Sequence, residues 1–185
     1  MNQRQKHTLI AVVVALLGVI LILIAGWFYG KEDRFNSYHN AQYGFSIGYP
    51  ASWEVQENIN KVAVVFVSPP LNALDTFREN ISIYIDDMSD NPTDMESYTA
   101  RQIQAFQRMF EGHMVLLKSR QIPISGEVGY QIIFLGKGDG GDVKFMRAWV
   151  IKGLKAYHIT YGAPTTHYGR YELDMKRMLM SFRIE

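Results

Sequence analysis

The stretch Tyr43-Gly44-Phe45-Ser46-Ile47-Gly48-Tyr49 alternates large apolar or aromatic side chains with small ones. In an extended strand successive side chains point to opposite faces, so the four large residues would share one face of a sheet. Pro50 follows directly and is expected to end the strand, because proline cannot donate a ladder hydrogen bond. This stretch therefore predicts that the folded region opens with a half-buried β-strand.

Outward from this strand, the same alternation or short β-branched runs recur along the chain. Gly and Pro positions separate the runs, and the Gly/Asp-rich segment 136–142 is typical of a hairpin connection. Residues 182–184 are expected to form an extended tail. The further strands are expected at residues 53–57, 61–67, 81–85, 114–117, 130–135, 145–151 and 157–161.

Two helices are expected among these strands. Thr93 with Glu96 three positions later forms a capping-box pattern, and Gly112 is a natural helix stop. The side chains expected to face the sheet are Met95, Thr99, Ile103, Phe106 and Phe110. A second, closing helix is expected at 168–180. The order of strands, helix, hairpin-linked strands and helix predicts an α+β fold: a mainly antiparallel sheet with helices on its faces.

Upstream of the domain, Leu9 to Tyr29 contains no charged residue. At about 1.5 Å per residue, a helix of this length would cross a bilayer core of about 30 Å. Trp27, Phe28 and Tyr29 end the run, as is usual at a membrane interface. We therefore expect a single transmembrane helix at 9–29; a cleaved signal peptide is the alternative.

Basic residues set the expected orientation of this anchor. Arg4 and Lys6 precede the apolar run, whereas the charges at 31–34 cancel. The positive-inside rule then places residues 1–8 in the cytoplasm. Residues 30–42 are expected to form a linker, and residues 43–185 a domain on the periplasmic, extracytoplasmic side of the inner (cytoplasmic) membrane.

Charge is distributed unevenly within the predicted domain. Residues 31–100 carry four Lys/Arg and eleven Asp/Glu, whereas residues 101–185 carry thirteen and seven. Such halves form either ordinary solvated faces or oppositely charged docking faces. A near-neutral total argues against nucleic-acid binding. The candidate docking residues are Asp86, Asp87, Asp90, Arg170, Lys176 and Arg177.

Motifs for catalysis or cofactors are missing from the sequence. There is no cysteine, and no serine lies in a Gly-x-Ser-x-Gly elbow. The Gly-rich segment 136–142 precedes an expected strand, whereas a phosphate loop must open onto a helix. We expect no enzymatic activity, no cofactor and no metal. The alternative is a tethered ligand- or metal-binding envelope protein, if His113, His158 and His167 meet in the fold.

With the strands placed, the chain from about Tyr43 onward resembles the PsbP-like family. The resemblance implies a curved antiparallel sheet between helices. It also implies an accessory role, since the best-known member is an extrinsic subunit on the lumenal side of photosystem II. The residues that carry it are Tyr43-Gly44-Phe45-Ser46-Ile47, Tyr49-Pro50, Trp53, Phe66, Ser68-Pro69, Asp75, Asn80-Ile81, Ala156-Tyr157, Thr160-Tyr161 and Ser181-Phe182.

The expected anchor separates this chain from relatives that carry a targeting peptide or a lipid-bearing cysteine, and favours a bacterial, permanently tethered protein. Our hypothesis is a non-enzymatic, membrane-anchored accessory subunit. Its partners would be the lipid bilayer and an integral-membrane protein complex. A photosynthetic reaction centre or another electron-transfer complex, such as a respiratory one, would fit.

Overall fold

A computed structural model describes residues 19–20, 34–59, 62–73, 75, 77–138 and 141–185. The chain divides into two compact units, Met1–Phe35 and Asn36–Glu185. The expected anchor residues Leu9, Trp27, Phe28 and Tyr29 lie outside the described residues. Within the described ranges, no helix has the length and hydropathy needed to span a bilayer.

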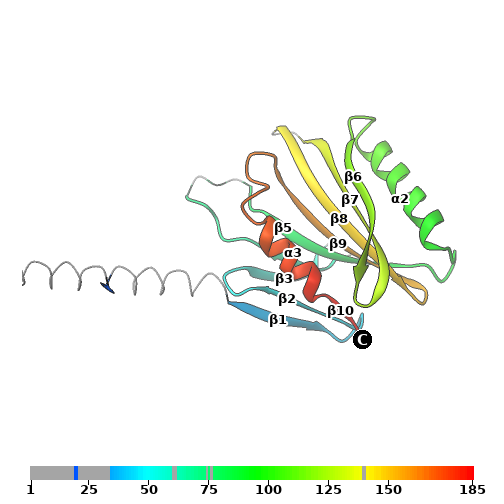
Figure 1. The fold of residues 1–185 in the computed structure, drawn as a ribbon, viewed down its shortest axis with the longest axis horizontal. Helices are drawn as coiled ribbons and strands as arrows, with labels where there is room; N and C mark the ends of the chain where they lie inside the picture. The colour runs from blue at the N-terminus through cyan, green and yellow to red at the C-terminus, as the bar shows by residue number, and fades with distance from the viewer. Residues whose placement is uncertain (1–18, 21–33, 60–61, 74, 76, 139–140) are drawn as a thin grey trace, which may run out of the picture. The chain divides into compact units, whose positions relative to one another are not determined.

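The second unit is built on a seven-stranded sheet in which every neighbouring pair is antiparallel (Figure 1). Three long hairpins between residues 115 and 164 form one half of this sheet. The expected α+β class with mainly antiparallel strands is confirmed. In spatial order the strands are β3 (Glu54–Ile59), β4 (Val62–Val67), β5 (Asn80–Asp87), β9 (Lys155–Pro164), β8 (Gly141–Lys152), β7 (Glu127–Gly138) and β6 (Val115–Ile124).

A small second sheet has the order β1 (Phe35–Asn40), β2 (Phe45–Pro50) and β10 (Arg183–Ile184). Its strand β1 corrects the expected linker at 30–42, because six of those residues form a strand. The Tyr38 ring lies 5.6 Å from the ring of Phe66 and 6.0 Å from that of Phe45. These aromatic contacts hold a strand whose own sequence is mostly polar.

Helix α2 (Met95–Met109) covers one face of the large sheet. Its Phe106 ring stacks on Phe134 of β7 at 5.6 Å. The expected sheet-facing residues are confirmed, and Tyr98 joins them, 2 % exposed. The cap differs from expectation by one residue: Asp94, not Thr93, accepts the hydrogen bond from the Ser97 backbone N–H.

Helix α3 (Glu172–Ser181) and the small sheet lie on the opposite face of the large sheet. Phe45 of β2 contacts both Tyr157 of β9 and Phe182, which follows α3. The expected helix at 168–180 starts later, because residues 165–170 form turns closed by backbone bonds such as Tyr168 N to Pro164 O. The domain thus has three layers, with the large sheet in the middle.

Candidate functional site

The predicted acidic docking residues serve mainly to hold the end of β5 and the start of α2. Asp86 accepts a hydrogen bond from the Tyr98 hydroxyl at 2.7 Å. Asp87 accepts bonds from the Ser89 hydroxyl and backbone N–H, which lower the pKa of its carboxyl group. Asp90 is exposed in the following turn. Two of the three acids are therefore engaged within the fold.

The predicted basic docking residues lie elsewhere, on and just before α3. Lys176 is exposed and pairs with Glu172 at 2.8 Å, one turn away on the same helix. Arg170 and Arg177 are also exposed. Figure 1 shows α3 apart from the loop between β5 and α2, so the two predicted groups lie on different elements in different parts of the domain. Their role in docking stays a prediction.

The three histidines of the alternative hypothesis are not brought together. His158 is completely buried beneath α2, His113 is exposed after α2, and His167 lies on the turn after β9. Across the residues with described positions, no cluster of three or more His, Cys, Asp or Glu side chains suits a metal ion.

His158 belongs to a buried polar chain. Its Nε2 lies 2.6 Å from the Tyr98 hydroxyl, which in turn donates to Asp86. Since the single phenolic proton goes to the carboxylate, Nε2 of His158 must carry a proton and donate to Tyr98. Burial, and then the nearby guanidinium of Arg147, lowers the pKa of His158 well below its usual value. The imidazole is therefore neutral, and the cluster pins α2 to β5 and β9.

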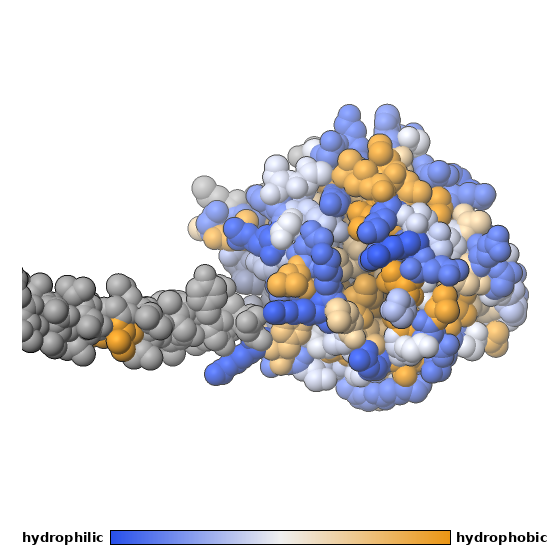
Figure 2. Space-filling model, in the orientation of Figure 1, coloured by the Kyte–Doolittle hydropathy of each residue, from blue (hydrophilic) through white to orange (hydrophobic). Residues whose placement is uncertain are grey.

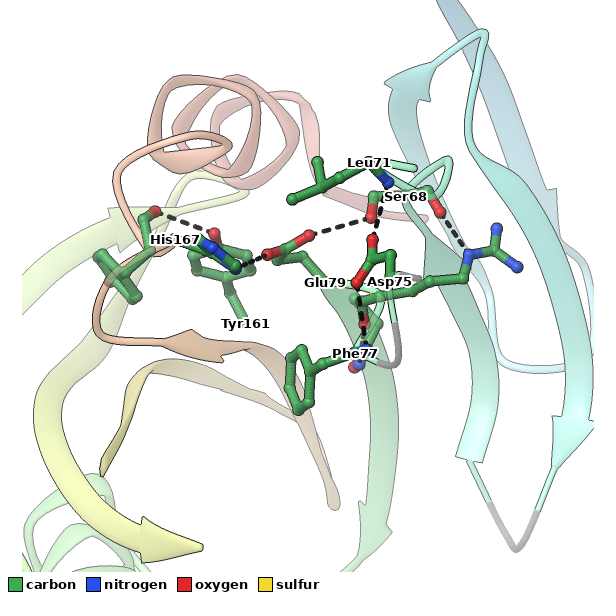
Figure 3. A network of polar contacts seen from close by, with 10 residues as sticks. Ser68, Leu71, Asp75, Phe77, Glu79, Tyr161 and His167 are labelled. Carbon is green, nitrogen blue, oxygen red and sulfur yellow. Dashed lines mark hydrogen bonds and ion pairs between the residues drawn. The ribbon is translucent and has the colours of Figure 1, made fainter. Parts of the chain in front are cut away.

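A second polar cluster surrounds Glu79 at the start of β5 (Figure 3). Its side chain is completely buried and accepts a hydrogen bond from Ser68 at 3.3 Å. His167 Nδ1 lies 3.7 Å from the other carboxylate oxygen of Glu79. The Tyr161 hydroxyl donates to the backbone of Tyr168 at 2.9 Å. Together these bonds tie the β4–β5 connection to the turn after β9.

Arg78 and Asp75 complete this cluster. Arg78 donates to the Ser68 carbonyl at 2.6 Å and to Glu54 at 3.0 Å. Asp75 accepts from the backbone N–H groups of Leu71 and Phe77, and these bonds contribute to the lowered pKa of its carboxyl group. The carboxylates of Glu79 and Asp75 both accept hydrogen bonds that order a loop, so the role of this cluster is to stabilise the fold.

The most exposed part of the sheet is its edge strand β6. Seven consecutive residues from Val115 to Gln121 are exposed, and β6 is the last strand in the sheet order. Val115, Leu116 and Leu117 are 54 %, 44 % and 51 % exposed. We call these three residues the β6 apolar tip; Figure 2 shows apolar surface gathered at this end of β6. A run of apolar side chains beside an unpaired strand edge is typical of a protein-binding surface.

The sequence did not single out β6 as a site. The run Val115-Leu116-Leu117 was expected to be an ordinary strand, and nothing local distinguishes a buried apolar run from an exposed one. Only the sheet order shows that this strand is paired along one edge and has no neighbouring strand along the other in the described part of the chain. A clue was present in Lys118, Arg120 and Pro123, because charged residues and proline are common on edge strands.

Fold and site together define an α+β domain whose loops are held by polar clusters and whose sheet has an exposed edge strand. Residues 33–184 match the PsbP family over most of the chain. The chain therefore belongs to the PsbP family. No curated protein sequence matches it.

Several solved structures share the fold. Cyanobacterial PsbP (CyanoP) from Synechocystis sp. PCC 6803 superposes with a TM-score of 0.61 at 17 % identity, covering 82 % of this chain and 92 % of that one. LpqN, involved in cell envelope biogenesis of Mycobacterium tuberculosis, gives a TM-score of 0.60 at 11 % identity, covering 87 % and 96 %. The Ran-binding protein Mog1p of Saccharomyces cerevisiae gives 0.56 at 10 % identity, covering 82 % and 95 %.

Proposed function

We propose that this protein is a non-enzymatic accessory protein that binds a larger membrane complex through the β6 apolar tip. One observation carries the proposal: Val115, Leu116 and Leu117 are exposed beside a strand edge that has no neighbouring strand in the described part of the chain. An extended partner segment could add to such an edge and bury these three side chains. Membership of the PsbP family supports an accessory role.

The membrane is the proposed location of this contact. The uncharged run from Leu9 to Tyr29 would anchor the chain in the inner membrane, with the domain on the extracytoplasmic side. One structural neighbour, LpqN, is involved in cell envelope biogenesis, which offers the cell envelope as one setting. We favour a photosynthetic or other electron-transfer complex, on family analogy alone.

Co-purification tests the proposal directly. Full-length protein tagged at its native expression level, extracted in a mild detergent, should bring down stoichiometric integral-membrane partners. The double variant L116S/L117S should lose these partners, whereas Leu154→Ser should keep them. Leu154 is the matched control because it is 49 % exposed but lies on the β8–β9 turn. Recovery of the unaltered protein alone, or equal recovery of partners by all variants, would refute the proposal.

A further inference from the structure

A groove opens on the α3 face of the large sheet, between α3 and the β6–β7 hairpin. Its volume is about 610 Å³, within the range of about 300–1,000 Å³ that is typical of small-molecule sites. Figure 2 shows apolar surface between α3 and β6, interrupted by strongly hydrophilic side chains. The groove is separate from the β6 apolar tip, which does not line it.

The walls of the groove are largely apolar and adaptable. Ile122 and Ile133 line it from the hairpin, and Met175, Leu179 and Met180 line it from α3. Met180 is 75 % exposed. Covering such an apolar side chain lowers the free energy, so this exposed surface favours binding of an apolar group. Methionine is unbranched and flexible, so these walls can adapt to an alkyl chain.

The charged side chains of the groove are mainly cationic. Lys118, Arg120 and Lys176 line it, with Glu172 as the single acidic residue. Glu172 is already paired with Lys176 at 2.8 Å. Two cations therefore remain without a neutralising carboxylate in the groove lining, which favours an anionic group.

Tyr168 adds a buried hydrogen-bond donor to the lining. It is only 3 % exposed, and its hydroxyl has no hydrogen-bond partner in the described structure. Burial, and then Glu172, raises the pKa of Tyr168, so its hydroxyl keeps its proton at neutral pH. Buried donors are nearly always paired in proteins, so an unpaired hydroxyl on a residue that lines a groove points to a ligand acceptor.

We infer that this groove binds a single-chain anionic amphiphile, such as a fatty acid or a lysophospholipid. The alkyl chain lies against Ile133, Met175 and Leu179, and the carboxylate or phosphate is held by Lys118 and Arg120. The Tyr168 hydroxyl donates to a ligand oxygen. A flat bilayer surface would not reach a residue as buried as Tyr168, so a monomeric ligand fits the concave groove better. This ligand site does not depend on the proposed docking role.

Photo-crosslinking tests the inference on the full chain. Full-length protein, held in an uncharged amphipol, is mixed with a diazirine-bearing palmitate and irradiated. Crosslinks are expected in segments 118–133 and 168–180. Unlabelled palmitate should compete, whereas an uncharged monoacylglycerol with the same chain should compete at least about tenfold less well. A parallel arm with lysophosphatidylglycerol distinguishes a phosphate head group from a carboxylate.

Contrary outcomes are equally specific. Crosslinks confined to segment 9–29, or equal competition by the uncharged chain, would overturn the inference. Binding to anionic vesicles without crosslinks in the groove would do the same.

Point variants separate ligand binding from folding. Arg120→Gln is expected to weaken palmitate binding by about tenfold or more, because a hydrogen bond to a charged group is lost. Arg108→Gln is the matched control, since Arg108 is exposed in the last turn of α2, on the other face. Unchanged affinity in Arg120→Gln would contradict the inference.

Tyr168→Phe gives a second readout, because it removes only the unpaired hydroxyl. The variant should bind palmitate several-fold more weakly, while its unliganded melting temperature stays unchanged or rises. Unaltered affinity would show that the hydroxyl does not bind the ligand. A fall in the unliganded melting temperature would show that it stabilises the fold instead. Either outcome would contradict the inference.

Discussion

The two faces of the large sheet are covered in different ways. On the α2 face, the rings of Phe106, Phe134 and Phe145 stack in a row with centroids 5.6 and 5.1 Å apart. Trp149 beside them is completely buried. On the α3 face, α3 covers only part of the hairpin side and leaves a groove of about 610 Å³. The α2 face is closed by packing along this aromatic row, although a hollow of about 460 Å³ remains at the start of α2; the α3 face keeps apolar surface open.

This difference suggests that the α2 face mainly stabilises the domain and that the α3 face and the β6 apolar tip mainly bind other molecules. Closely packed aromatic side chains on the α2 face stabilise the domain. The groove lining and the β6 apolar tip leave apolar side chains exposed to water, which is unfavourable. Exposed apolar surface of this kind is typical of binding sites. Substitutions on the α2 face should therefore reduce stability, whereas substitutions on the open side should reduce binding.

The largest effect is expected from Trp149→Ala. Trp149 is 0 % exposed, and its indole N–H donates to Thr99 of α2 at 3.2 Å. The cavity and the lost bond should lower the free energy of unfolding by about 3–5 kcal/mol. Urea denaturation followed by circular dichroism measures the change. Leu173→Ala on α3, at 60 % exposure, should change it by less than about 0.5 kcal/mol. Similar losses in both variants would break the comparison.

Gly129→Ala is expected to have the next largest effect. A Cβ at this position would lie 2.6 Å from Ile124 Cδ1 and 2.8 Å from the Trp149 backbone oxygen. Backbone cannot move aside cheaply, so the loss should be about 1–3 kcal/mol. Gly169→Ala is the control, since a Cβ added there would have no neighbouring atom within 4 Å. The two midpoints of thermal unfolding should differ by several degrees; equal midpoints would show that β7 can shift without cost.

Acid should destabilise the folded domain through His158, which is buried under α2. Its pKa is lowered by burial and by Arg147, so the unfolded chain binds a proton below about pH 6.5 while the folded chain does not. Stability is then full above about pH 6.5 and falls as pH drops, by at most about 1.4 kcal/mol per pH unit. Chemical denaturation between about pH 7 and pH 5 should show this slope, and His158→Gln should flatten it. The same change at exposed His113 should leave the slope intact.

The smallest effect on stability is expected at the β6 apolar tip. Leu117→Ser alters a side chain that is 51 % exposed, so the free energy of unfolding should change by less than about 0.5 kcal/mol. Thermal unfolding of the purified variant measures it. A loss of about 2 kcal/mol or more would show that Leu117 packs within the fold and would place β6 with the closed face.

Periodicity predicted the closed face well. The helical spacing of Ile103, Phe106 and Phe110 identified the side of α2 that meets the sheet, because burial of one helix face leaves a repeat in the sequence. Tyr98 was missed since it lies beside that stripe and is buried for its hydroxyl bonds to Asp86 and His158. Polar partners distant in sequence leave no such repeat.

The open side could not be predicted by the same reasoning. The groove joins segment 118–133 to segment 168–180, and no local pattern shows that these segments meet. Strand β1 was missed for a related reason: Phe35–Asn40 is mostly polar and is held by its place beside β2. His158 lies in a strand buried on both faces, so alternation gave no indication of its surroundings.

The pairing of β2 with β10 sets an order of events during synthesis. Gly48 N–H donates to the Ser181 hydroxyl across 133 positions of the chain, and Glu185 N–H donates to the Gly44 carbonyl. A ribosome releases residues in sequence order, so one edge of β2 stays unpaired, and Phe45 lacks the ring of Phe182, until residues 182–185 emerge. The domain can therefore complete its fold only once residues 182–185 have left the ribosome and reached β2, so the small sheet stays unfinished while the preceding residues are made.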